Sequence, residues 1–174
     1  MAEQAQIDEL TKKMAEERGR LLEVLERLDD AEAVRPTTGE GEWSAKQQMA
    51  HLCEMETAYR AWVAKILQED GAILDNVRGE APAITLEQAH EHSVGRLVDE
   101  MRSQREKTVA LIGALHPDDF ERTGTQRMFG SLTVMQWLRS YYRHDRMHYD
   151  QVRGADPEYK PRYAGGKEPD QRRA

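Results

Sequence analysis

The stretch SYYRHDRMHYDQV, residues 140–152, places His144 and His148 four positions apart in a run that has the pattern of a helix. Successive residues of an α-helix turn by about 100°, so residues four apart lie on one face. The apolar positions of this helix form one stripe, which consists of Val134, Leu138, Tyr141 and Val152. His148 falls inside the stripe and His144 at its edge. We therefore expect both imidazoles to point into the protein, where each needs a polar partner.

Three other segments show the same helical spacing of apolar residues, at steps of three and four. The first stripe runs through Ile7, Leu10, Met14, Leu21, Leu25 and Leu28. The second follows a predicted N-cap, Ser44, and consists of Met49, Leu52, Met55, Tyr59, Val63 and Ile66. The third follows a predicted capping box of Thr85 and Gln88, and consists of Leu86, Leu97, Met101, Thr108, Leu111 and Leu115. The fourth helix is predicted to begin near Ser131 or Thr133.

These stripes predict an all-α protein, a four-helix bundle, because four amphipathic helices bury their apolar faces best against one another. No segment shows sustained alternation of apolar and polar residues, so no strand is expected. Residues 70–84, between the second and third helices, can reach about 50 Å when extended. The helix predicted for residues 44–69 is about 39 Å long. The connection is therefore long enough to run back along that helix, which would make the third helix parallel to the second.

The bundle is predicted to occupy residues 1–153 as one domain. Residues 154–174 are polar, rich in proline and glycine, and without periodicity. We expect this short C-terminal tail to be irregular and loosely ordered.

The composition excludes several classes of partner. The chain has 174 residues, with 32 carboxylates against 25 Lys and Arg and a formal net charge of -7, so no nucleic-acid partner is expected. No stretch approaches the roughly 20 apolar residues that span a bilayer, so no membrane partner is expected either. Cys53 is the only cysteine, which excludes an internal disulfide and favours a reducing, cytoplasmic location.

A pair of histidines at this spacing is weak evidence for a site, because most core histidines are simply hydrogen-bonded. His51, on the second helix, is the best candidate for a third imidazole at a matching depth. Cys53 lies about 200° around the helix from His51 and is expected to pack. Glu56 is expected to be solvated at the edge of the stripe, and His90 to be a packing or surface residue.

The sequence resembles the DinB-like (DinB/YfiT-like) family of bacterial four-helix metalloproteins. The resemblance covers residues 1 to about 153 and rests on short motifs: Trp43-Ser44, His51-Leu52, Leu132-Thr133, His144-x3-His148 and Gln151-Val152. It implies an up-down-down-up helix order. It also implies that His51, His144 and His148 hold one divalent transition metal (Zn, Ni, Fe or Mn) together with water.

The resemblance implies an activity as well, because family members with known activity are similar to S-transferases and isomerases that use mycothiol or bacillithiol. We therefore expect a metal-dependent enzyme that transfers a low-molecular-weight thiol to a small electrophile. Two alternatives stay open: a small-molecule hydrolase at the same site, and a non-catalytic metal-binding stress protein. The expected partners are a small-molecule substrate and a second copy of the chain in a homodimer.

Other polar residues have two interpretations each. Asp145 could orient a histidine or accept a proton near the metal, or it could be a surface carboxylate paired with Arg139, Arg143 or Arg146. Tyr59 and Tyr141 could line a substrate pocket or be plain core residues. Arg127 and Arg143 could bind an anionic substrate or the carboxylates of a thiol cofactor.

Overall fold

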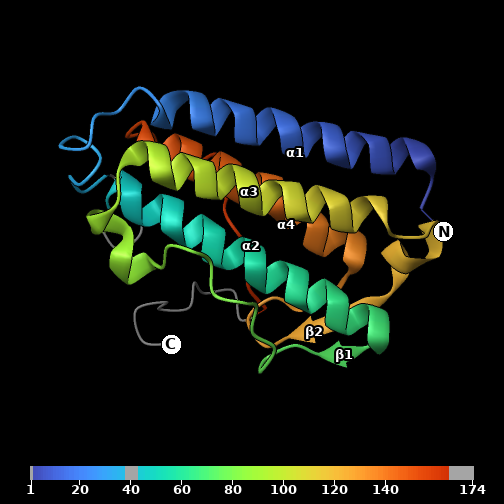
Figure 1. The fold of residues 1–174 in the computed structure, drawn as a ribbon. Coiled ribbons are helices and arrows are strands. Elements are labelled where there is room, and N and C mark those ends of the chain that lie inside the picture. The colour runs from blue at the N-terminus through green and yellow to red at the C-terminus, as the bar shows by residue number, and fades with distance from the viewer. Residues whose placement is uncertain (1, 38–42, 165–174) are drawn as a thin grey trace.

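The computed structural model describes residues 2–37 and 43–164, and its main feature is a bundle of four long helices (Figure 1). These helices are α1 (Gln4–Leu25), α2 (Ala45–Gln68), α3 (Val94–Gly113) and α4 (Val134–Val152). Helices α1 and α4 run in one direction, and α2 and α3 run in the other. The predicted four-helix bundle and its up-down-down-up order are therefore confirmed. None of the helices in the described part of the chain is long and apolar enough to cross a membrane.

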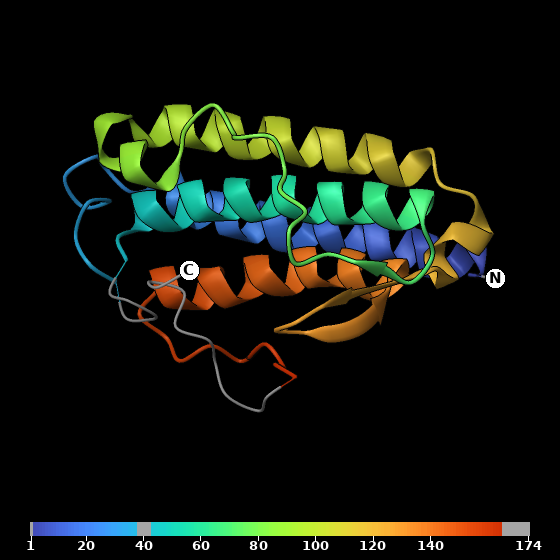
Figure 2. The same ribbon diagram turned by 90° about the horizontal axis from the view of Figure 1, so that it is seen from below.

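The long crossover between α2 and α3 makes their parallel arrangement possible. It contains the short strand β1 (Ala72–Ile73) and the 3₁₀-helix η2 (Leu86–Glu91), and it returns along the bundle (Figure 2). Thr85 and Gln88 form the predicted capping box, but they cap η2 rather than a long helix. Helix α3 begins later, where the Ser93 side chain accepts a hydrogen bond from the backbone of Arg96. The prediction that one continuous third helix begins at Thr85 is therefore wrong, because α3 begins at Val94.

A small three-stranded sheet lies alongside the bundle, against α2 and α4, although no strand was expected from the sequence (Figure 2). After α3 the chain forms the 3₁₀-helix η3 (Pro117–Glu121), then β2 (Thr123–Gln126) and β3 (Gly130–Thr133). Strand β2 pairs in parallel with β1 and antiparallel with β3. With two to four residues each, these strands are too short to show sustained alternation of apolar and polar residues in the sequence. The sheet is minor and leaves the helical class unchanged.

The crossover lies directly on the backbone of α2. A Cβ atom at Gly79 would come within 2.4 Å of the carbonyl carbon and oxygen of Thr57. Nearby, the indole N–H of Trp62 donates to the carbonyl oxygen of Val77 at 3.1 Å. On the other side, Glu100 of α3 accepts a hydrogen bond from the backbone of Ala83. These contacts fix the crossover against both parallel helices, so the outer face of α2 is covered.

The apolar core is divided into two clusters along the bundle. On α1, for example, Met14 belongs to one cluster and Leu21 to the other. Each helix carries a buried charged residue between its contributions to the two clusters: Arg18 on α1, Glu56 on α2, Arg105 on α3 and Asp145 on α4. We refer to these four residues as the charge cluster. It joins all four helices at one level.

The segment after α4 is irregular, as expected, but it makes defined contacts. It turns at Gly154, which has a positive φ of 73°, and runs back beneath α4 toward the sheet (Figure 2). Glu158 accepts a hydrogen bond from Arg146, and the ring of Tyr163 stacks on Phe129 with centroids 5.3 Å apart. The segment therefore covers part of α4 as far as residue 164. The prediction of loose order for the tail as a whole stays a prediction.

We predict that Gly79→Ala destabilises the protein, because the added methyl group would collide with the α2 backbone rather than with a movable side chain. Overpacking of this kind typically costs about 1–3 kcal/mol. Urea unfolding followed by circular dichroism would measure it. Gly19→Ala is the matched control, because a Cβ at this exposed position in α1 meets nothing within 4 Å. That control should gain about 0.5–1 kcal/mol. Equal stability of the Gly79 variant and the native chain would contradict the packing described here.

Candidate metal centre

Three imidazoles from two helices converge on one point inside the bundle. His51 lies on α2, and His144 and His148 lie one turn apart on α4. The Nε2 atom of His144 is 3.3 Å from Nε2 of His51 and 3.0 Å from Nε2 of His148. His51 and His148 are buried, and His144 is half-buried. The structure thus brings together the three histidines that the sequence singled out.

The spacing of these nitrogen atoms fits one small metal ion. Two nitrogen ligands at about 2.0–2.1 Å from a tetrahedral ion are about 3.4 Å apart, close to the spacings observed here. All three ligand atoms lie within 4.8 Å of one another. Within residues 2–37 and 43–164, no cysteine or carboxylate joins this group. Three protein ligands leave one coordination position for water or substrate, as in catalytic rather than closed structural sites.

The electrostatic environment keeps the three rings neutral, which metal binding requires. Burial, together with the nearby Arg18 guanidinium, lowers the pKa of His144 from 6.5 to about 4. Burial also lowers the pKa values of His51 and His148 well below 6.5, and the neighbouring imidazoles add to the effect. At neutral pH each ring therefore offers a lone pair without first losing a proton.

A glutamine and a tryptophan from the start of α2 support the site, and the sequence interpretation missed their roles. The Oε1 atom of Gln48 is 2.8 Å from Nδ1 of His148. The Trp43 ring lies against His51, with centroids 4.7 Å apart. Gln48 lies three residues before His51, on the same face of α2, and this spacing could have identified it.

A small pocket opens beside His144, between α2 and α4. It is lined by the complete charge cluster together with Leu52, Met55, Tyr59, Tyr141 and His144. The structure therefore places Tyr59 and Tyr141 together at this pocket, with ring centroids 4.9 Å apart. Burial raises the pKa of Tyr59, and Tyr159 and Tyr163 of the segment after α4 add to this effect. This segment therefore lies close to the pocket. Whether Tyr59 and Tyr141 bind a substrate stays a prediction.

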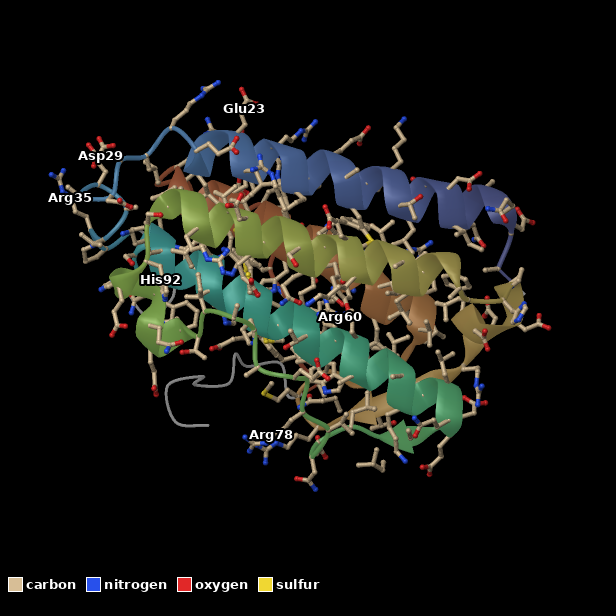
Figure 3. All side chains as sticks on the ribbon, viewed as in Figure 1. Glu23, Asp29, Arg35, Arg60, Arg78 and His92 are labelled. Carbon is tan, nitrogen blue, oxygen red and sulfur yellow. The ribbon has the colours of Figure 1, made fainter. Side chains whose placement is uncertain are left out.

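The charge cluster forms the inner part of the pocket lining. Asp145 accepts hydrogen bonds from Arg18 at 3.1 Å and from Arg105 at 2.8 Å. Glu56 accepts from the same two arginines, at 2.8 and 2.7 Å. Arg60, labelled in Figure 3, extends the network from α2 to Gln104 and Thr108 on α3.

Two interpretations of the carboxylates are corrected by this arrangement. The solvated position expected for Glu56 is wrong, because the residue is 2% exposed. The surface pairing considered for Asp145 is also wrong, because the side chain is fully buried and its partners are on α1 and α3. Both oxygens of Asp145 are already bonded to guanidinium groups. Its direct role as a proton acceptor stays a prediction, and its evident role is to join helices next to His144.

The remaining candidates lie away from the histidines. Arg127 is exposed in the turn between β2 and β3. Arg143 is exposed on α4 and lies over the rings of Tyr142 and Tyr159. Neither arginine lines the pocket, so their contact with a substrate stays a prediction. His90 is exposed, as expected, and hydrogen-bonds to the Ser44 hydroxyl at 2.8 Å.

Comparison of the sequence with known proteins identifies its family. A family model described as the DinB superfamily matches residues 13–152. The protein YuaE of Bacillus subtilis is 29% identical over 128 residues, which cover 64% of this chain and 76% of YuaE. The residues matched by the family model include all three histidines, and the family agrees with the one expected from the sequence motifs.

Solved structures share the fold. YfiT from Bacillus subtilis, described as a probable metal-dependent hydrolase with an unusual four-helix bundle topology, matches with a TM-score of 0.69 and 16% identity, over 88% of this chain and 87% of YfiT. A mycothiol-dependent maleylpyruvate isomerase matches with a TM-score of 0.68 and 13% identity. That match covers 84% of this chain but 60% of the isomerase. At these identities the likeness shows the fold alone.

We predict that the metal-free protein loses stability as the pH falls from 7 toward 4. Unfolded imidazoles titrate near pH 6.5, whereas the folded ones have lowered pKa values, about 4 for His144. Between these values the unfolded state binds more protons, so the free energy of unfolding falls with the pH. Urea unfolding of chelator-treated protein at several pH values would measure the slope.

The variant His148→Gln should show a shallower slope, because it removes one buried imidazole with a lowered pKa. His116→Gln is the matched control, because His116 is exposed. Equal slopes for the two variants would contradict the assignment of the pH dependence to the buried histidines.

Proposed function

Because this chain belongs to the DinB superfamily and brings three imidazoles together beside a pocket, we propose that it is a metal-dependent enzyme that transfers a low-molecular-weight thiol to a small electrophile. The metal would be a divalent first-row ion such as Zn, Ni, Fe or Mn, held by His51, His144 and His148. The observation that carries the proposal is the convergence of three neutral nitrogen ligands without a fourth protein ligand in the described residues. Such a set would leave a coordination position open for water or substrate, and His144 also lines the pocket.

A bound divalent ion would supply Lewis acidity, which favours the ionised form of a thiol or water at its open position. The histidines would hold that position at the pocket while the bundle excludes bulk water from His51 and His148. In the transfer, the thiol sulfur forms a bond to an electrophilic carbon. The S–H proton of the thiol is lost in this step. Either chloride leaves that carbon and the proton passes to solvent, or an epoxide C–O bond opens and its oxygen takes up the proton.

The chain supplies no thiolate of its own for such chemistry. Cys53 is its only cysteine, and burial raises the pKa of this thiol to about 12. Cys53 is also absent from the pocket lining. A nucleophilic thiol would therefore come from outside the protein, which supports a small thiol as co-substrate.

The two pocket tyrosines are suited to bind an oxygen atom of the electrophile. Burial raises the pKa values of both Tyr59 and Tyr141, so their hydroxyl groups stay protonated and can donate. The hydroxyl group of Tyr141 makes a long contact of 3.5 Å with the carbonyl oxygen of Glu56. Leu52 and Met55 provide the apolar side of the pocket. An anionic group at the outer end of a substrate or thiol could reach the exposed Arg143 or Arg127.

Two alternatives use the same three histidines. Hydrolysis with water as the nucleophile is supported by the description of YfiT as a probable metal-dependent hydrolase. The main proposal, thiol transfer, is supported by the mycothiol dependence of the isomerase that shares the fold. A non-catalytic metal protein is the less favoured alternative, because structural sites usually fill all positions with protein ligands. The cytoplasmic location and the homodimer remain parts of the proposal.

Metal content tests the first step of the proposal. Purified protein should carry about one divalent ion per chain, measured by plasma mass spectrometry, since one set of three nitrogen ligands holds one ion. His148→Ala should lose most of this metal, whereas His116→Ala, altered at an exposed histidine, should retain it. Wild-type protein that stays metal-free after incubation with zinc, nickel, iron and manganese would rule out the site.

Turnover tests the second step. Metal-loaded protein should conjugate a small bacterial thiol to a chlorinated or epoxide electrophile, detected by mass spectrometry of the thioether. His144→Ala should reduce turnover to the uncatalysed rate while circular dichroism shows an unchanged helix content. Turnover that survives complete metal removal would contradict the proposal. If no thiol is conjugated while ester or amide substrates are cleaved, the hydrolase takes its place.

A further inference from the structure

The orientation of the Gln48 side chain determines which nitrogen of His148 carries the proton. Gln48 is buried on the first turn of α2, and its Oε1 atom lies 2.8 Å from Nδ1 of His148. An amide can present either its oxygen or its NH₂ group to a ring nitrogen, and only the surrounding hydrogen bonds distinguish the two. The partners on the other side of Gln48 are therefore decisive.

Those partners accept hydrogen bonds from Gln48. The carbonyl oxygen of Trp43 can only accept, and the Thr37 hydroxyl donates to it at 2.9 Å. With its proton used in this way, the Thr37 oxygen is an acceptor for the Gln48 amide N–H. The same NH₂ group also lies 3.3 Å from the carbonyl oxygen of Trp43. A flipped amide would place its oxygen against that carbonyl oxygen, which is unfavourable.

The NH₂ group of Gln48 therefore faces Thr37 and Trp43, and its oxygen faces His148. An amide oxygen accepts, so Nδ1 of His148 must be the protonated nitrogen of the neutral ring. In that tautomer the lone pair of His148 lies on Nε2. This is the atom that points toward His144 and His51.

We propose that Gln48, oriented by Thr37 and the carbonyl group of Trp43, is a positioning residue that holds His148 in the Nδ1–H tautomer with Nε2 free for a metal. This inference rests on the proposed metal-dependent function. It also gives the connection before α2 a role, because Thr37 and Trp43 lie on that connection and Trp43 contacts His51 as well. The start of α2 thus supports two of the three ligands.

The tautomer can be observed directly in the metal-free protein. Long-range ¹H–¹⁵N correlation spectra of labelled protein distinguish a ring protonated at Nδ1 from one protonated at Nε2. The native chain should show His148 in the Nδ1–H form. Gln48→Leu removes the acceptor and should give a mixture or the Nε2–H form. Because no metal is present, this measurement is independent of the proposed enzyme activity.

Two matched controls separate this role from simple packing. Gln151 is another buried glutamine, and its side chain hydrogen-bonds to His148 as well, so Gln151→Leu tests the rival partner and should leave the Nδ1–H tautomer in place if Gln48 determines it. Thr37→Ser keeps the hydroxyl group that orients Gln48, whereas Thr37→Val removes it with little change in volume. The serine variant should behave like the native chain and the valine variant like Gln48→Leu. This pair tests the proposal even if Gln48→Leu folds poorly.

Metal affinity gives the second readout. Loss of a group that orients a metal-binding histidine typically weakens binding by about 10–100-fold. Competition with a chromophoric zinc chelator should show a loss of this size for Gln48→Leu and Thr37→Val, and none for Thr37→Ser. Native protein with His148 in the Nε2–H form, or unchanged tautomer and affinity in Gln48→Leu, would overturn the proposal. If the tautomer results hold but the native chain binds no metal, the proposed function fails while the assignment of Gln48 stands.

Discussion

The charge cluster is the constraint on which the rest of the structure depends, because it joins one residue from each helix at a single level. Its four ion pairs, between 2.7 and 2.9 Å, connect two arginines with two carboxylates and leave no net charge. Burying each ion costs several kcal/mol, which good geometry and further hydrogen bonds offset. The backbone carbonyl groups of Met14 and Met101 supply two of those bonds. Any axial shift of one helix would break pairs with the others, so the cluster fixes the helix register.

This register sets the geometry of the histidines. Asp145 lies on α4 between the two histidines. It directly follows His144 and comes three residues before His148. When Asp145 is held by Arg18 and Arg105, His144 and His148 are placed at the depth of His51 on α2. Removing one partner of a buried ion pair costs about 3–5 kcal/mol, because the other charge is left unpaired. The ion pairs of Asp145, the residue next to His144, therefore fix the axial position of α4 relative to the other helices, and with it the position of the metal site.

The sequence predicted the helices and the three histidines because both follow from periodicity, which is a local signal. It did not predict the charge cluster, since a pair such as Glu56 and Arg105 depends on two helices meeting. One signal was present: Arg18 continues the stripe of Met14 and Leu21, so a charge occupied a position predicted to be buried. The same applies to Gln48, one turn before His51. The strands were missed because strand β1 has only two residues and exists through its pairing with β2.

The pocket lies where the two halves of the core meet, and this location determines how it can select a ligand. The aromatic rings of Tyr59 and Tyr141 line it, and His144 is the one residue of the three-histidine site in its lining. The charge cluster, which also lines the pocket, is internally paired, so it adds no net charge there. Three neutral imidazoles likewise add no negative charge, so a bound divalent ion would keep its full charge at the pocket rim. The strongest attraction would then act on an anionic donor such as a thiolate, and the electrophile would be selected by its fit against the tyrosines.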